Sequence, residues 1–231
     1  MERLSETYCN KVNSCIKAIE SLGYDVNKLV AKYSGQHFPQ GPDKSRCFGQ
    51  VIIQKLSDKI HGYMDEKCSL AHHRDSRMPY EYGIDLILGW LVEDAFILLM
   101  EEKCKKAILS GNDRYREFLH PRKISTQPDI SFMSQKGPRM LEIFADWKGT
   151  WRNKNHADLR DNKFKKLREH DAVMVGIAPL TTEGFIVDFS KGNQGFEESF
   201  IPAYRKTGYT CKNIRDILKP LKEVVTELLA L

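Results

Sequence analysis

The spacing of apolar residues changes along the chain, and the change separates a helical first part from a mixed second part. Helical spacing predicts helices in five segments: 1–34, 45–64, 84–109, 156–169 and 212–231. Short apolar runs bounded by polar residues predict strands in four others: 130–133, 140–147, 172–178 and 185–189. Gly23 is expected to end the first helix, and residues 69–82 are expected to form a loop.

This order of elements predicts an α/β fold with a central mixed β-sheet flanked by helices. Lys136-Gly137-Pro138 is a suitable hairpin turn between the first two predicted strands. We expect one structural domain with three parts: an N-terminal helical region at 1–83, a core at 84–190, and a C-terminal loop and helix at 191–231.

The most apolar stretch, residues 84–100, is a candidate for a membrane span. It reads IDLILGWLVEDAFILLM and contains Asp85, Glu93 and Asp94. A spanning helix needs ~20 apolar residues, and a central charge is costly there. A buried core helix is the better interpretation, and no membrane partner is expected.

Composition adds a modest bias toward a polyanionic partner. The 231 residues are 41% hydrophobic, which is enough for a core, and the formal net charge is +5. None of the six cysteines forms a C-x-x-C pair, and the first residues do not resemble a signal peptide. These features favour a cytoplasmic protein with reduced thiols.

Candidate chemistry lies at the ends of the first two predicted strands. Asp129 begins one strand, whereas Asp146 and Lys148 lie two residues apart near the end of the next. Residues two apart on a strand project from the same face, and a hairpin would bring Asp129 to the same point. Two carboxylates suit Mg²⁺, and the carbonyl of Trp147 is a further candidate ligand. Lys148 is suited to orient a water or to stabilise a charged transition state.

These residues resemble the PD-(D/E)xK nuclease superfamily, which includes the type II restriction endonucleases. Pro128-Asp129 matches the first half of the motif and Asp146-Trp147-Lys148 the second, within residues 84–190. The resemblance implies a restriction-endonuclease-like core with Asp129, Asp146 and Lys148 as catalytic residues. It also implies Mg²⁺-dependent, site-specific hydrolysis of double-stranded DNA by a homodimer, giving 5′-phosphate ends.

The same family uses an acidic residue on the preceding helix, and two residues are candidates here. Glu93 lies within WLVEDAFILLM, where an unpaired buried carboxylate would cost several kcal/mol and a nearby metal would supply a cation. Glu142, on the same strand face as Asp146, ranks below Glu93 because it also fits a strand-edge charge. His72-His73 is interpreted as part of a surface loop.

Polar and basic residues follow Lys148 and are candidates for DNA contacts. The predicted contact residues are Arg152, Asn153, Lys154, Asn155, His156, Arg160, Lys163 and Lys166. Arg, Lys and Asn side chains can bind phosphates or base edges. A solvated helix face is the commoner explanation of such a basic run.

Two alternatives remain open. One is another nuclease of the same superfamily, such as a junction resolvase or a phage or transposon nuclease. The other is a basic DNA-binding module without catalysis, in which Asp146-Trp147-Lys148 is a coincidence. A phosphate-binding P-loop, a nucleophile elbow and an H-E-x-x-H helix are all absent from the sequence, which argues against an ATPase, an α/β-hydrolase and a zincin.

Overall fold

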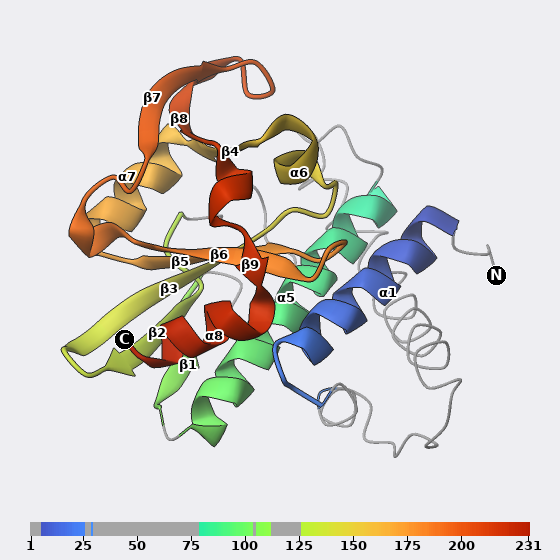
Figure 1. Cartoon of the computed structure of the whole chain (residues 1–231), viewed down its shortest axis with the longest axis vertical. Helices are drawn as coiled ribbons and strands as arrows, with labels where there is room; N and C mark the ends of the chain where they lie inside the picture. The colour runs from blue at the N-terminus through green and yellow to red at the C-terminus, as the bar shows by residue number, and fades with distance from the viewer. Residues whose placement is uncertain (1–5, 26–28, 30–78, 104, 112–125) are drawn as a thin grey trace.

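The computed structural model describes residues 6–25, 29, 79–103, 105–111 and 126–231 (Figure 1). The helix expected at 45–64 and the His72-His73 pair lie outside the described residues.

A six-stranded mixed sheet forms the centre of the fold, in the order β1-β2-β3-β5-β6-β9. Its strands are β1 (Ala107–Leu109), β2 (Ile130–Ser134), β3 (Gly137–Ala145), β5 (Val173–Ala178), β6 (Glu183–Asp188) and β9 (Lys219–Pro220). The β3–β5 pairing is parallel, and the other pairings are antiparallel. Every residue of β5 is buried, which explains its continuous apolar run. The expected α/β architecture with a helix-flanked mixed sheet is therefore confirmed.

Two layers cover the two faces of this sheet (Figure 1). Helices α1 (Glu6–Ser21), α5 (Pro79–Glu102) and α8 (Leu221–Leu229) share one apolar cluster with Val173, Val175 and Ile177 of β5. Met174 and Ala178 point to the opposite face and pack in a second cluster with Phe164 and Leu167 of α7 (Asp161–Glu169). Because successive side chains of β5 point to opposite faces of the sheet, this one strand packs against both layers.

A smaller sheet in the order β4-β8-β7 completes the second layer. It consists of β4 (His156–Arg160), β7 (Phe196–Ile201) and β8 (Lys206–Lys212). Short helix α6 (Thr150–Lys154) precedes β4, and two 3-10 turns, η3 (Phe189–Lys191) and η4 (Ile214–Ile217), connect the remaining elements. Ala157 and Leu159 of β4 point inward to the cluster around Phe164.

Several predicted boundaries are wrong, each for a local reason. The segment 156–169 is not one helix, because 156–160 pairs with β8 as a strand before α7 begins. The last helix begins at Leu221 instead of 212, after Pro220, which lacks the N–H that a helix interior requires. Helix α5 begins at Pro79, within the expected loop, and ends at Glu102. The last residues of the helix predicted at 84–109 instead form strand β1.

The first hairpin forms where expected, but its turn is Gln135-Lys136, because Ser134 pairs with Gly137 and both Gly137 and Pro138 already belong to β3. Gly137 has φ +113°, a conformation that glycine adopts without the strain of a side chain.

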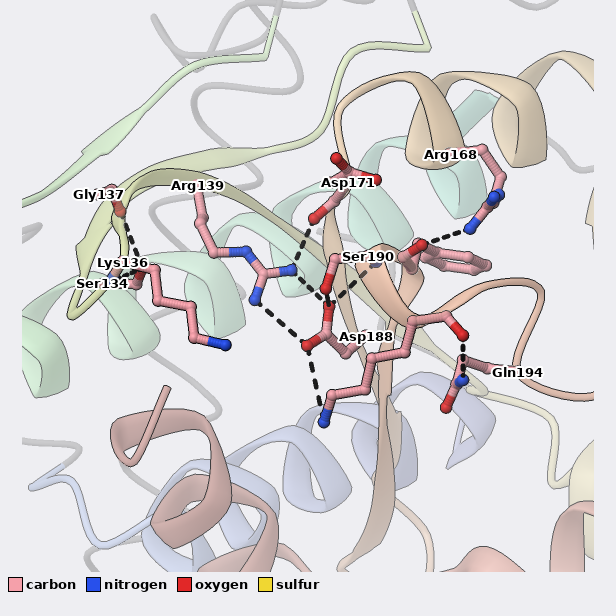
Figure 2. Close-up of polar contacts among 11 residues, drawn as sticks. Ser134, Lys136, Gly137, Arg139, Arg168, Asp171, Asp188, Ser190 and Gln194 are labelled. Carbon is pink, nitrogen blue, oxygen red and sulfur yellow. Dashed lines mark hydrogen bonds and ion pairs between the residues drawn. The ribbon is translucent and has the colours of Figure 1, made fainter.

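An ion pair, here called the Arg139 clamp, joins β3 to the end of β6 (Figure 2). The Arg139 guanidinium contacts both carboxylate oxygens of Asp188, with Nη2 2.5 Å from Oδ1 and Nη1 3.3 Å from Oδ2. It also donates to the carbonyl of Asp171 at 2.6 Å, and Ser190 donates to Asp188 through its N–H and hydroxyl. Burial raises the pKa of Asp188, but the hydrogen bonds and charge of Arg139 and the bonds from Ser190 outweigh it and hold the pKa below its ordinary value.

Candidate active site

The sheet divides where β2 begins. Pairing between β2 and β3 runs from Ser134–Gly137 to Ile130–Leu141, whereas residues 141–145 of β3 pair with β5 on their other side. Beyond Leu141, the N–H of Ile143 faces away from β5 and donates to the Asp129 carboxylate at 2.9 Å. The Asp129 carboxylate therefore takes the place of a strand at the division.

Neighbouring contacts fix the backbone of Asp129. Its carbonyl accepts the N–H of Ser110 at 2.8 Å and that of Gly111 at 3.3 Å, just beyond β1. The Ser110 hydroxyl donates to the carbonyl of Pro128 at 2.8 Å. Asp129 immediately precedes β2, one residue before the strand start, and these contacts hold it at a defined place beside the sheet.

Glu142 is the next carboxylate at this division. It lies on β3 with 5% of its surface exposed, and its Oε2 is 2.5 Å from Nζ of Lys163 on α7. Burial raises the pKa of Glu142 well above its ordinary value, and the charges of Asp129 and Glu93 raise it further. The charge and hydrogen bond of Lys163 act in the opposite direction without cancelling the effect.

Glu93 supplies the third carboxylate. It is 7% exposed on α5, and the neighbouring Asp94 is 4% exposed, so neither faces solvent. Its charge acts on Glu142 although α5 covers the opposite face of the sheet. Among the causes that raise the pKa of Glu142, the charge of Glu93 is the smallest.

We call Glu93, Asp129, Glu142 and Lys163 the acidic fork. Within the fork itself, three carboxylates outnumber one ammonium when all are ionised. Carboxylate oxygens are the ligands that Mg²⁺ prefers, and a divalent cation would compensate that excess. In the arrangement seen here, the described Asp, Glu, His and Cys residues do not form a group of three close enough to enclose a metal ion. The donor chemistry fits Mg²⁺, with Lys163 as the observed cation beside Glu142.

Asp146 and Lys148 have a different environment. Strand β3 ends at Ala145, so the alternation expected for Asp146 and Lys148 does not extend to them. Asp146 is 7% exposed, and its carboxylate accepts the N–H of Lys148 at 3.1 Å and that of Trp151 at 2.7 Å. Since α6 begins without a capping side chain from Gly149, Asp146 stabilises its first turn from outside the helix. Lys148 is exposed in the intervening turn.

Trp147, proposed from the sequence to offer its carbonyl to a metal, is half-buried. Its side chain packs against the apolar cluster of α1, α5 and α8.

Most residues predicted to contact DNA surround α6 and β4, with Arg152, Asn153, Lys154 and Arg160 exposed. The Arg152 guanidinium pairs with Glu183, with Nε 2.8 Å from Oε2, and that of Arg160 lies 5.0 Å above the Tyr204 ring.

The other predicted contact residues are partly engaged within the protein. Asn155 accepts the N–H of Arg215 at 2.9 Å, His156 lies 3.3 Å from Asp158, and Lys166 is 2.8 Å from Glu169. Lys163 differs from the rest of the set, because its partner is the buried Glu142.

Comparison of the chain with protein-family models, curated proteins and solved structures finds no match. In the part of the chain that the structure describes, no helix is long and apolar enough to span a membrane.

Proposed function

We propose that this protein is a Mg²⁺-dependent endonuclease that hydrolyses phosphodiester bonds of double-stranded DNA, with the acidic fork as its active site. The observation that carries the proposal is the pair of carboxylates at the division between β2 and β3: Asp129 accepts the N–H of Ile143, and the adjacent buried Glu142 lies 2.5 Å from Lys163. Burial and the charges of Asp129 and Glu93 raise the pKa of Glu142. A buried cluster of like charges costs stability, and such perturbed groups are concentrated at functional sites.

The motif resemblance supports the proposal in a revised form. Pro128-Asp129 retains its place as the first half of the motif, and Glu142, ranked second from the sequence, becomes the acidic residue of the second half. Glu93 keeps the role of the additional acid on the preceding helix. The rival assignment is the one the motif spacing favours, with Asp146 and Lys148 in the second half.

The residues of the fork suit hydrolysis by in-line attack. Asp129 and Glu142 would hold Mg²⁺, with Glu93 adding negative charge, and the metal when bound supplies positive charge for the phosphate and lowers the pKa of a water. Asp129 is oriented by the N–H of Ile143, and Glu142 is fixed within the β3–β5 pairing. Burial of Glu93 and Glu142 limits competition from solvent and strengthens their electrostatic effect.

The finer features of the proposal follow from the motif resemblance and the exposed cations. Arg152, Lys154 and Arg160 are exposed and suited to contact phosphates. We propose a restriction-endonuclease-like core that acts as a type II restriction endonuclease and leaves 5′-phosphate ends. A homodimer would match the two-fold symmetry of a short palindromic site.

The test is cleavage of supercoiled plasmid, phage DNA and a four-way junction, with and without Mg²⁺. The variants are Asp129→Asn, Glu142→Gln and Asp146→Asn, each checked for folding by circular dichroism. We expect discrete Mg²⁺-dependent fragments from the wild type and a loss of at least about 10²-fold in the two fork variants, the size typical for one electrostatic group.

Each other outcome has a defined meaning. Cleavage of the junction in place of linear sites would indicate a resolvase. Activity that survives Glu142→Gln but is lost in a folded Asp146→Asn would assign the site to Asp146 and Lys148. DNA binding without cleavage of any substrate would reject the nuclease and leave a binding module.

A further inference from the structure

Lys163 is placed at the fork by the packing of α7. The helix buries Phe164 and Leu167 against the second layer, and Lys163 lies beside this apolar face, four residues before Leu167. Its side chain is 20% exposed, which contrasts with 67% for Lys165 two residues later. The long methylene chain of Lys163 is thus largely covered while its ammonium reaches Glu142.

Strand β3 provides no lysine at the corresponding place. The residue two positions beyond Glu142, on the same face of the strand, is Phe144. Its ring lies 5.7 Å from that of Trp151, within the second apolar cluster. Lys148 is two residues beyond Asp146 instead, exposed in the turn before α6.

We infer that Lys163, supplied by α7, is the catalytic lysine of this site in place of Lys148. The inference rests on the proposed nuclease function and adds a residue that the motif did not identify. Glu142 holds the ammonium of Lys163 beside the carboxylates that would bind the metal. A scissile phosphate bound to that metal would therefore lie close to the positive charge of Lys163.

The role follows from the charge of the reaction. The oxygen of water forms a bond to phosphorus while the bond from phosphorus to O3′ breaks, and the electron pair of that bond stays on O3′. The attacking water loses one proton to solvent, and O3′ takes one proton from solvent. Lys163 remains protonated and stabilises the negative charge that builds on the phosphate oxygens.

The experiment compares Lys163→Gln and Lys163→Met with Lys165→Gln, a matched control on the exposed face of the same helix. Single-turnover cleavage of plasmid in Mg²⁺ is measured beside Mn²⁺ affinity by calorimetry and thermal melting. We expect both Lys163 variants to cleave about 10²- to 10³-fold more slowly, with Mn²⁺ affinity changed by no more than a few-fold. Lys165→Gln should cleave within about threefold of the wild type, since its position is exposed.

If Lys163→Met does not fold, Lys163→Gln alone tests the inference, because the glutamine amide can still donate to Glu142. Near-wild-type cleavage by Lys163→Gln would overturn the inference, as would a large loss in Lys148→Gln instead. Loss of Mn²⁺ binding together with cleavage would also overturn it, because Lys163 would then act by placing a metal ligand. A wild type that cuts no DNA would reject the nuclease function itself, which separates that failure from failure of the inference.

Discussion

The central sheet holds two sets of charged side chains that differ in how their charges are balanced. In the Arg139 clamp, one guanidinium faces the carboxylate of Asp188, and Ser190 adds two hydrogen bonds. In the acidic fork, Lys163 faces Glu142 while Asp129 and Glu93 add negative charge. Both sets include β3, and their carboxyl pKa values shift in opposite directions.

The opposite shifts identify different roles. The partners of Asp188 outweigh its burial, so its ionised form stabilises the fold. For Glu142, burial and the two neighbouring acids outweigh Lys163, so its ionised form costs stability. A protein tolerates such a cost at a functional site. The comparison therefore separates a structural ion pair from a candidate active site within one sheet.

The largest expected effect is loss of the clamp. Arg139→Met removes the nearer cation of Asp188 and leaves Lys191, whose Nζ is 3.9 Å from Oδ2. We expect the free energy of unfolding in urea to fall by about 3 kcal/mol, the lower end of the range for breaking a buried pair, because Lys191 still offsets part of the charge. The double variant Arg139→Met/Asp188→Leu should recover much of the loss, because it removes the stranded charge as well. A loss below about 1 kcal/mol in the single variant would mean that the clamp is not a structural ion pair.

A divalent cation should have the next largest effect, and it should act on the fork. At a Mn²⁺ concentration 100 times its dissociation constant, the wild type should gain about 2.7 kcal/mol of stability. Calorimetry and thermal melting would measure the gain. We expect it to disappear in Asp129→Asn and to persist in Arg139→Met, where the fork is intact. An equal gain in Asp129→Asn would place the cation elsewhere.

Neutralising Glu142 should have a smaller effect and the opposite sign to loss of the clamp. Since the ionised form costs stability, we expect Glu142→Gln to stabilise the metal-free protein near pH 7 by about 0.5–2 kcal/mol, as replacements at functional sites often do. Urea unfolding beside the wild type would measure it. Asp188→Asn is the matched control and should destabilise. A destabilised Glu142→Gln would indicate that the ion pair with Lys163 outweighs the repulsion.

The elements that could be predicted from sequence were those with strong local patterns. The runs that became β2, β3, β5 and β6 are apolar enough to define the sheet, and Gly137 marks their first turn. Strand β1 has three residues, too few to show a period. Strand β4 becomes a strand by pairing with β8, and its two inward residues, Ala157 and Leu159, are too few to outweigh the helical spacing of α7 that follows directly.

The candidate site was predictable in part, for a related reason. The PD motif and the apolar surroundings of Glu93 direct attention to Asp129 and Glu93, two residues whose charges raise the pKa of Glu142. The spacing of Asp146 and Lys148 matched the motif, but an aspartate shortly before a helix is equally suited to cap it, and this is its observed contact. The pairing of Lys163 with Glu142 depends on how α7 packs, which a linear pattern does not show.

The smallest expected effects are on the pH dependence of stability, which should differ in sign between the acidic fork and the Arg139 clamp. The raised pKa of Glu142 means that the folded state binds a proton more readily than the unfolded state between the ordinary value of 4.5 and the folded value. Wild-type stability therefore rises relative to Glu142→Gln as pH falls through the folded pKa, until both states are protonated below about 4.5. Urea unfolding across pH 3–8 would show the stability advantage of Glu142→Gln shrinking on acidification.

The stability contribution of the Arg139 clamp should change only at lower pH than that of the fork, and it should fall on acidification. Because the folded pKa of Asp188 is below its ordinary value of 3.8, its contribution is fully present above that value and is lost as pH falls through the folded pKa. The stability difference between wild type and Arg139→Met should thus stay constant down to about pH 4 and narrow below it. A difference that narrowed between pH 7 and 5 would contradict this order, because the clamp would then be titrating in the range assigned to the fork.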